Sequence, residues 1–439
     1  MSTKDSFSPK WGLVFAAAST AVGLGNMWLF PYRVGERGGA AFVIPYIICA
    51  VTLGLIALIG EVSMGRLTSG GPATAFQKIL QLRNNKNTVP GKTFGWICVF
   101  VALIQATSYT LILSWVIRFT LGSLTGSAFN AVNSSQYYAA ISSSEHVLFW
   151  MVVTLITAII ALVGGIRNGI EKCCTIMLPA VFILIIILAI RVAFLPNVYV
   201  GYKYLFTPDW NYLFDARTWM VALGQVFYSL SLRGSTMVTY GSYTQKTSDL
   251  ISSAKYIVFA DIFVSILATF MIIPSVFAFG KNLNSGPALL FTTLPEVFKS
   301  IPFGQSFMFS FFLAILFAAL MSFIGQLEVV VQALHDKFKF PRLLAIFLVS
   351  TATVLLCKIF VVGNIKKVIN LLSLHLIPLC ALGSAIFFFW ITPKHLALQE
   401  IQSGHLKPIG KWIVPIGRYA LCGIILFIYI LNILATLKN

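Results

Sequence analysis

The chain has 439 residues, of which 58% are hydrophobic and only 10% are charged. Soluble domains carry roughly 25% charged residues, so a water-soluble enzyme or a nucleic-acid-binding protein is excluded, and the lipid bilayer is the expected solvent. The net charge of +18 at pH 7 then indicates an excess of Lys and Arg in cytoplasmic loops, with no nucleic-acid partner.

Apolar stretches that are long enough to span a bilayer recur along the whole chain. A spanning helix needs about 20 residues, and about eleven stretches meet that length. They cover residues 11–35, 40–65, 94–124, 146–164, 173–195, 217–243, 252–279, 304–334, 342–361, 367–391 and 412–436. The sequence therefore predicts a single all-α transmembrane domain over residues 1–439, with 125–145, 196–216 and 280–302 as the longer connections.

The distribution of Lys and Arg predicts the orientation of this domain. If the N-terminus is cytoplasmic, most cations fall in cytoplasmic loops, and a smaller set that includes Arg33 and Arg37 lies outside. An odd number of spans then places the C-terminus outside. We expect a multi-pass protein of the plasma (inner) membrane, and no oligomeric state follows from the sequence.

Two of the stretches contain a polar, glycine-rich interruption. Residues 21–26 read AVGLGN in the first stretch, and residues 229–235 read SLSLRGS in the sixth. Peptide groups released there need partners, because lipid offers none. The interruptions lie five spans apart, as in two inverted five-helix repeats (about 11–195 and 217–391, with 412–436 as an extra helix). Paired broken helices indicate a transporter site at the bilayer midplane; glycines that serve only helix packing are the alternative.

Short motifs resemble the neurotransmitter:sodium symporter family, in particular its bacterial branch of eleven helices. They are WG at 11–12, AVGLGN at 21–26, FPY at 30–32, GGAAF at 38–42, MGR at 64–66, GIEK at 169–172 and GQVFYSLS at 224–231. The resemblance covers nearly the whole chain. It implies sodium-coupled import of an amino acid or a related small zwitterion or polar solute by alternating access, with Na⁺ as the coupling ion and no enzymatic chemistry.

The resemblance implies two sodium sites made of oxygen ligands. The first site would use the Ala21 carbonyl and the side chains of Asn26, Ser229 and Asp261. The second would use the carbonyls of Ser19, Val22 and Ala318 and the hydroxyl of Ser322. Its remaining position holds Met321, where relatives carry Thr or Asp. Because a thioether is a poor ligand for sodium, we expect the second site to be weak or absent.

Asp261 has a further implication for anion dependence. Chloride-dependent relatives place a tyrosine, a glutamine, two serines and an asparagine around the anion. The matching residues here are Tyr46, Gln225, Ser229 and Ser265, with Asp261 at the asparagine position. A fixed negative charge repels chloride and replaces it electrostatically, which predicts chloride-independent transport. A structural aspartate paired with a neighbouring hydroxyl is the alternative.

By the same resemblance, the substrate carboxylate would meet the N–H groups of Leu24 and Gly25 and the hydroxyl of Tyr109. The rest of the substrate site would be Ala21, Gln105, Tyr228, Ser231, Arg233, Gly234, Ser322 and Gln326. Two of these are glutamines where relatives carry aliphatic residues, and Arg233 replaces a glycine. Either Arg233 and the glutamines form a polar subsite for an acidic or hydrogen-bonding substrate, or Arg233 pairs internally with Glu61 or Glu328.

The resemblance implies an outer and an inner gate, of which only the inner one keeps its pair of charged residues here. The outer ion pair of the family is lost, because its positions hold Leu29 and either Ile369 or Asn370. The inner gate is expected to pair Lys4 with Asp336. Two alternatives to sodium symport stay open: Met321 and His375 suggest a sodium-independent or proton-coupled carrier on the same scaffold, and a solute sensor that does not transport is the other.

Overall fold

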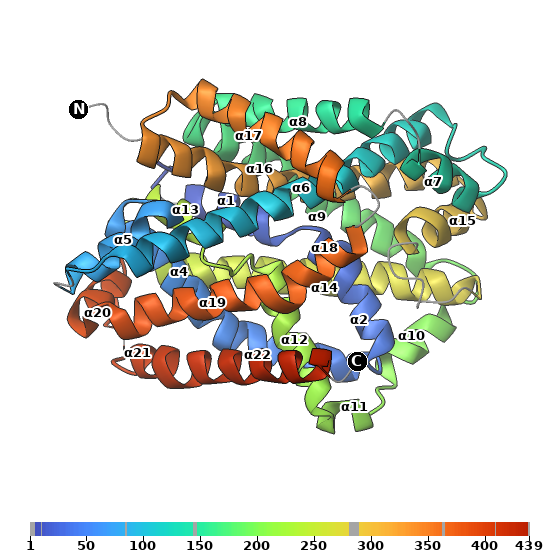
Figure 1. The fold of residues 1–439 in the computed structure, drawn as a ribbon. Helices are drawn as coiled ribbons and strands as arrows, with labels where there is room; N and C mark the ends of the chain where they lie inside the picture. The colour runs from blue at the N-terminus through green and yellow to red at the C-terminus, as the bar shows by residue number, and fades with distance from the viewer. Residues whose placement is uncertain are drawn as a thin grey trace.

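The computed structural model describes residues 5–9, 11–83, 86–143, 147–280, 289–361, 365–408 and 410–437, and within these ranges all regular structure is helical. The long helices run side by side as a bundle (Figure 1). At one end of the bundle lie the short helices α5 (Pro72–Leu82) and α20 (Lys394–Gln402). At the other end lie α7 (Ser134–Ser143), α10 (Tyr199–Phe206) and α15 (Leu294–Lys299).

Seven continuous helices of the described residues are long and apolar enough to cross a membrane. They are Ala40–Thr68 (α3, Ala40–Cys49, a π-helical turn and α4, Leu55–Thr68), Val89–Thr125 (α6), Ile166–Ala193 (a π-helical turn and α9, Lys172–Ala193), Leu250–Ala278 (α14), Gly304–Phe338 (α16), Arg342–Ile359 (mainly α17, Arg342–Leu356) and Ile413–Leu431 (α21, Ile413–Pro415, a π-helical turn and most of α22, Cys422–Leu437). The expectation of an all-α membrane protein is confirmed.

Three bent helix pairs of the described residues raise the number to at most ten, if each pair is counted as one span. The first joins α1 (Gly12–Ala21) to Gly25–Glu36 at an angle of 43°, where the second half is a π-helical turn followed by α2 (Phe30–Glu36). The others are α7 with α8 (Val147–Val163), and Ile377–Ile391, which begins with α19 (Ile377–Ala385), with α20. The helix α18 (Ile365–Leu371) precedes α19.

The remaining expected stretch, 217–243, is split into α12 (Ala216–Ser229) and α13 (Thr236–Ser242), and each piece is too short to count as a span by itself. Including it, the structure accounts for all eleven predicted stretches. The relationship between residues 11–195 and 217–391 as inverted repeats stays a prediction. Within the connection 196–216 lie α10 and α11 (Asn211–Phe214).

The first interruption is a change of hydrogen-bonding partner. The Val22 N–H still donates to the Ala18 carbonyl, at 2.7 Å, but the next N–H, of Gly23, donates to the Asn26 side chain at 3.1 Å. The Gly23 carbonyl then accepts from Asn26 N at 3.1 Å. Gly23 also has no room for a side chain, because a Cβ there would lie 2.6 Å from Ser322 Oγ. The glycine and the asparagine of the AVGLGN motif thus create the break.

The second interruption contains two residues in the left-handed region. Ser231 has φ +56° and Gly234 has φ +65°, and a positive φ is costly for a serine. The Gly234 N–H, which has left the helix, donates to Glu61 Oε1 on α4 at 2.7 Å. The half-helix α13 is held against the same α4, since a Cβ on Gly65 would lie 1.9 Å from the Val238 carbonyl oxygen. Small residues allow this close approach of two helices.

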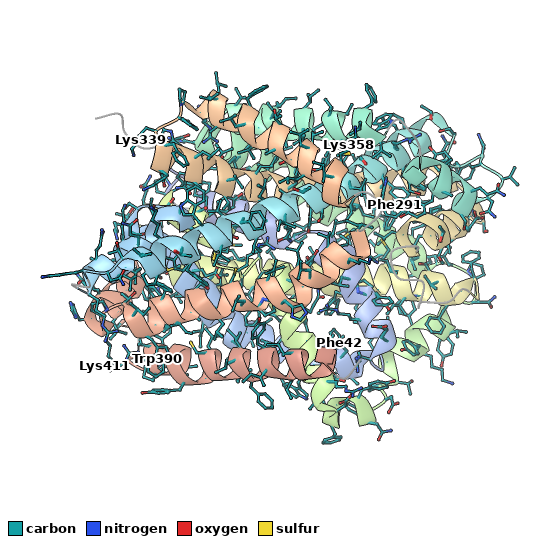
Figure 2. All side chains as sticks on the ribbon, in the orientation of Figure 1. Phe42, Phe291, Lys339, Lys358, Trp390 and Lys411 are labelled. Atoms are coloured by element: carbon teal, nitrogen blue, oxygen red, sulfur yellow. The ribbon has the colours of Figure 1, made fainter. Side chains whose placement is uncertain are left out.

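One end of the bundle is fastened by a buried charge network. Arg66 Nε donates to Glu400 Oε1 at 2.6 Å, and Lys246 Nζ lies 2.6 Å from Glu400 Oε2. Arg66 also donates to the Ser248 carbonyl at 2.7 Å. These contacts join α4, α20 and the segment after α13. Lys339 and Lys411 lie at this same end (Figure 2).

Candidate functional site

Asp261 on α14 is fully buried beside the first interruption. It accepts hydrogen bonds from three other elements: Asn26 Nδ2 at 2.7 Å, the Tyr46 hydroxyl of α3 at 2.6 Å and Ser229 Oγ of α12 at 3.1 Å. Ser265, one turn later on α14, lies 2.9 Å from Asn26 Nδ2 and 3.1 Å from the Tyr46 hydroxyl. The structure therefore brings together the side chains expected at the first sodium site.

This cluster carries a negative charge without a cationic partner. Among the described residues, no Lys, Arg or His forms an ion pair with Asp261. An ionised carboxylate inside the membrane is costly and usually functional. Gln225 does not join the cluster, because its Nε2 donates instead to the Gly25 carbonyl at 2.9 Å. The arrangement can hold a small cation among oxygen atoms, and the carboxylate leaves little reason for an anion to bind there.

Of the residues expected at the second sodium site, Ser322 and Ala318 lie on α16 where it contacts the end of α1, which carries Ser19 and precedes Val22. Ser322 Oγ donates to the Thr20 carbonyl at 3.0 Å and to the Ala318 carbonyl at 3.3 Å. Met321 is fully buried next to Ser322. Ser19 Oγ is buried and has no hydrogen-bond partner. The oxygen atoms are present, but the thioether occupies one position where relatives supply an oxygen.

A cavity of about 210 Å³ lies beside the first interruption, between the first span, α6 and α12. Of the predicted substrate residues, Leu24, Gln105, Tyr109 and Tyr228 line it, and so do both expected outer-gate positions, Leu29 and Ile369. The predicted residues that do not line it are Ala21, Gly25, Ser231, Arg233, Gly234, Ser322 and Gln326. Several of these lie close by: a Cβ on Gly25 would be 3.0 Å from the Tyr228 ring, and one on Gly23 would lie 2.6 Å from Ser322 Oγ and 3.8 Å from the Tyr109 hydroxyl.

Arg33, to which the sequence motifs assign no role, also lines this cavity. Its Nη1 donates to the Val221 carbonyl of α12 at 3.2 Å. It follows Leu29 by four residues, so the two side chains share one face of a helix. This spacing could have indicated the role of Arg33 from the sequence, because Arg33 lies one helical turn after Leu29, the position where the family carries an arginine.

Arg233 is buried but pairs with neither of the carboxylates proposed for it. Glu328 accepts from Arg342 at 2.7 and 3.1 Å and from the Tyr243 hydroxyl at 2.7 Å. Glu61 Oε1 accepts from Gly234 N and, at 2.8 Å, from Ser384 Oγ. No ion pair involves Arg233 in the described part of the chain. The described part of the structure therefore contains no ion pair of Arg233 with Glu61 or Glu328.

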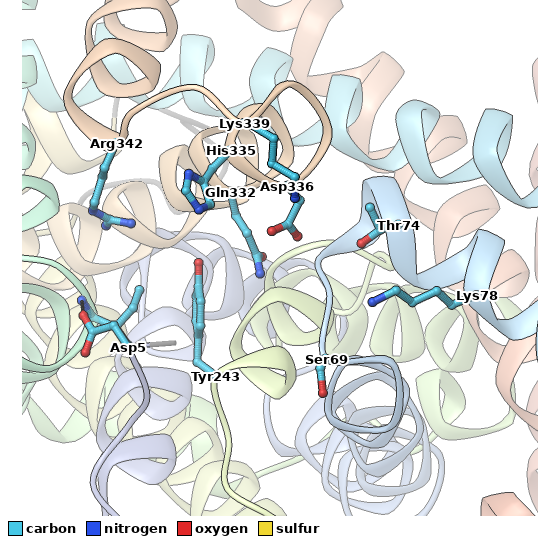
Figure 3. A pocket seen from close by; sticks show the side chains of 11 residues that line it. Asp5, Ser69, Thr74, Lys78, Tyr243, Gln332, His335, Asp336, Lys339 and Arg342 are labelled. Atoms are coloured by element: carbon cyan, nitrogen blue, oxygen red, sulfur yellow. Dashed lines mark hydrogen bonds between the residues drawn. The ribbon is translucent and has the colours of Figure 1, made fainter. Parts of the chain in front are cut away.

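A second, larger cavity of about 560 Å³ lies at the end of the bundle that carries α5 (Figure 3). Asp336 lines it, as do Lys78 and Lys339, and Asp336 Oδ2 accepts from Gly71 N at 3.3 Å. Lys4, the expected partner of Asp336, lies outside the described residues. Phe7 is buried and packs edge-on against Tyr240 and Tyr243, with ring centroids 5.4 and 6.1 Å apart. The segment before α1 is thus packed against the C-terminal end of α13.

His375, the residue behind the proton-coupled alternative, lies in the turn Leu372–Leu376. It lines neither cavity, although its neighbours Leu372 and Ser373 line the smaller one. The position gives a proton relay through His375 no direct route to the solute cavity.

Comparison with known proteins agrees with this geometry. Residues 4–139 and 127–435 match the sodium:neurotransmitter symporter family. The sodium-dependent transporter YhdH of Bacillus subtilis is 34% identical over 358 residues, which are 78% of this chain and 77% of YhdH. A sodium-dependent transporter of Methanocaldococcus jannaschii is 29% identical over 93% of this chain and 86% of its own length.

The crystal structure of MhsT in complex with L-phenylalanine superposes with a TM-score of 0.87 at 29% identity, and covers 98% of this chain and 99% of MhsT. The similarity therefore extends over the broken helices and both cavities. Together with the matched residues, it establishes that this chain is a multi-pass membrane protein of the sodium:neurotransmitter symporter family, whose members are sodium-coupled secondary transporters and not enzymes.

Proposed function

We propose that this chain imports an amino acid or a related small zwitterion across the plasma (inner) membrane, coupled to sodium and independent of chloride. The observation that carries the proposal is the buried Asp261, which lies beside the interrupted first span and forms no ion pair with any described Lys, Arg or His. The complex of MhsT with L-phenylalanine supports an amino-acid substrate, because that relative covers almost the whole chain. The N-terminus is cytoplasmic and the C-terminus outside in this proposal.

Sodium bound at the first site would connect ion binding to solute binding. Asn26 supplies an amide oxygen, Ser229 a hydroxyl and Asp261 a carboxylate, and the Ala21 carbonyl completes the set. Hard cations prefer such oxygen ligands. The Leu24 and Gly25 N–H groups, at the start of the second half of the span, favour an anionic group by the helix dipole. Sodium therefore orders the same turn that receives the substrate carboxylate.

Chloride independence follows from charge. Without Asp261, the cluster of Tyr46, Ser229 and Ser265 would present hydroxyl groups to an anion; with it, those hydroxyls are already hydrogen-bonded to a carboxylate or lie beside one. A second anion a few ångströms away would be repelled strongly at low local dielectric. In this proposal the Asp261 carboxylate supplies the negative charge that a bound chloride supplies in chloride-dependent relatives.

Alternating access explains how the two cavities serve one site. In this proposal the half-helices α1, α2, α12 and α13 tilt against the remaining spans, and the inverted repeats 11–195 and 217–391 give the outward-open and inward-open forms related geometry. Asp336 belongs to the inner gate. The outer gate lacks the family's ion pair, and Arg33 is the one cation among the described residues that line the cavity.

The test is uptake by the purified protein in proteoliposomes. A labelled amino-acid mixture is offered with an inward sodium gradient, with an inward proton gradient and with no gradient, in chloride and in gluconate. We expect accumulation only with sodium, at equal rates in the two anions. Accumulation driven by protons alone, or a strict chloride requirement, would contradict the proposal. Ligand binding without counterflow would identify a sensor.

A further inference from the structure

Several buried side chains of the described residues near the interruptions, Gln225 and Ser235 among them, carry polar atoms without a hydrogen-bond partner. Three of these side chains belong to the predicted substrate site: Arg233 (Nε and Nη1), Gln105 (Oε1) and Gln326 (Nε2 and Oε1), whose exposed fractions are 1%, 3% and 0%. A buried polar atom that has lost its water and gained no partner is destabilising, and such groups in native structures call for an explanation. A bound ligand that forms hydrogen bonds with these atoms is one such explanation.

Of the three side chains, Gln105 lines the proposed substrate cavity, and Arg233 and Gln326 lie on segments next to it. Gln105 precedes Tyr109 by one turn of α6, and both line the 210 Å³ cavity with Tyr228. Arg233 lies near enough to Tyr109, Tyr228 and Glu61 to interact with them electrostatically. Gln326 follows Ser322, the neighbour of Gly23, by one turn of α16. One guanidinium and two amides therefore approach the substrate region from α6, α16 and the second interruption.

Most oxygen atoms of the buried carboxylates near this region already have partners. Glu328 is held by Arg342, and Asp261 by Asn26, Tyr46 and Ser229. Glu61 uses Oε1 to hold the Gly234 backbone; its Oε2 is unpartnered, and the residue lines a separate cavity of about 10 Å³, which is room for about one water molecule. Among the described residues, no carboxylate lies within ion-pair distance of Arg233, although Glu61 is near enough to interact with it electrostatically.

We propose that the substrate is an amino acid whose side chain ends in an oxyanion, a carboxylate or a sulfonate, and that Arg233, assisted by Gln105 and Gln326, binds that group. The inference rests on the proposed function, because it places the backbone carboxylate of the solute at the first interruption. A guanidinium is a rigid fork of donors that matches an oxyanion through two parallel hydrogen bonds. The amide N–H groups of the glutamines supply further donors.

The test compares acidic amino acids with their amides, which have nearly the same shape. Thermal unfolding of the purified full-length chain in detergent and sodium is followed against L-aspartate and L-asparagine, L-glutamate and L-glutamine, and L-cysteate. Ligands that bind the folded state raise its melting temperature. We expect one acidic ligand to act at a concentration at least about 30-fold lower than its amide, as for a buried charge pair. Comparing cysteate with aspartate distinguishes a sulfonate from a carboxylate, and comparing glutamate with aspartate tests the preferred side-chain length.

Arg233→Gln should abolish this preference: the half-saturating concentration of the acid rises by at least about 30-fold, while that of the amide changes little. Arg191→Gln removes the same charge from α9, where the guanidinium lies over the Phe307 ring, and should leave the preference intact. If Arg233→Gln does not fold, Arg233→Lys retains the charge without the fork and should still weaken binding of the acid.

Two results would overturn the inference and are distinguishable. If a neutral amino acid stabilises the protein most strongly in sodium, and Arg233→Gln or Arg233→Lys binds as the unsubstituted chain does, the oxyanion subsite is wrong while the proposed function stands. If no amino acid gives sodium-dependent stabilisation or uptake, the proposed function fails and the inference fails with it.

Discussion

The Tyr46 hydroxyl donates to Asp261 Oδ2 over 2.6 Å, and this bond joins the second predicted span to the seventh in the interior of the bundle. The same hydroxyl lies 3.1 Å from Ser265 Oγ. Tyr46 therefore fixes the direction of the Asp261 carboxylate, whose other oxygen accepts from Asn26. A carboxylate oriented in this way is prepared to receive a cation at little cost in reorganisation.

Tyr46→Phe tests this orientation without changing the ring. Removing one hydrogen bond to a buried charged group should cost about 1–3 kcal/mol of stability, seen as a lower melting temperature, and should raise the half-saturating sodium concentration several-fold. Tyr419→Phe, at an exposed tyrosine, is the matched control and should change neither. Unaltered sodium affinity in Tyr46→Phe would mean that Tyr46 serves packing alone.

Met321→Thr tests the second sodium site. The substitution places a hydroxyl beside Ser322, where the Ala318 carbonyl already lies 3.3 Å from Ser322 Oγ, and should restore an oxygen ligand. We expect the number of sodium ions per substrate, measured as the Hill coefficient of uptake and as radioactive sodium carried per substrate, to rise from about one towards two. Met321→Leu adds no oxygen and should keep the value near one. Two ions per substrate in the unsubstituted protein would show that Met321 does not weaken the site.

Glu400→Gln tests the charge network at the end of the bundle that carries α20. It leaves the buried Arg66, with an exposed fraction of 1%, without its carboxylate, and breaking one partner of a buried pair costs about 3–5 kcal/mol. Lys246→Met removes the other cation, which is 55% exposed, and should cost only about 0.2–1 kcal/mol. Thermal unfolding compares the two. Equal losses of stability in the two variants would show that the buried pair of Arg66 and Glu400 is not the main interaction that joins α4 to α20.

Asp249 predicts a pH-dependent contribution to stability. It caps α14 by accepting from Ile251 N and Ser252 N, at 3.1 Å each, and lies 2.9 Å from His405 Nδ1. Burial raises the pKa of Asp249, but the hydrogen bonds from Ser252 and His405 outweigh it and hold the pKa below its ordinary value. Its contribution is therefore complete above the ordinary pKa and is lost as the pH falls through the lowered one.

The measurement compares melting temperatures of the unsubstituted chain and Asp249→Asn. We expect the unsubstituted chain to be more stable at neutral pH, and the difference to shrink below about pH 4, near the ordinary pKa of an aspartate. A difference that persists unchanged well below that pH, where the carboxylate is protonated, would show that its charge contributes nothing to the cap.

The spans and both interruptions were predictable because they are local. Hydropathy identifies the stretches, and the glycine, asparagine and serine residues at 21–26 and 229–235 mark where helical bonding stops. The grouping of Asp261 with Asn26 and Ser229 was implied by the family resemblance, and the structure places the three side chains within hydrogen-bonding distance. Neighbouring positions on α14 face other directions, since each residue turns a helix by about 100°, so the contact itself identifies Asp261.

Features that depend on distant packing could not be read from the sequence. Arg66 and Glu400 are 334 positions apart, and neither has a local pattern that names the other. The path of residues 230–235 decides where Arg233 lies, and it follows from the positive φ of Ser231 and Gly234 and from the bond to Glu61. The cavity lining at Arg33 likewise depends on how α2 faces α6 and α12.

Asp261→Asn gives the most direct test of the central claim, that a fixed carboxylate binds sodium and replaces chloride. Sodium-driven uptake is measured in proteoliposomes in chloride and in gluconate, with Asp215→Asn, at a partly exposed cap of α12, as the control. We predict that the unsubstituted chain and the control transport equally in both anions, and that Asp261→Asn transports only when chloride is present. Equal transport by Asp261→Asn in gluconate, at unchanged sodium affinity, would contradict the account.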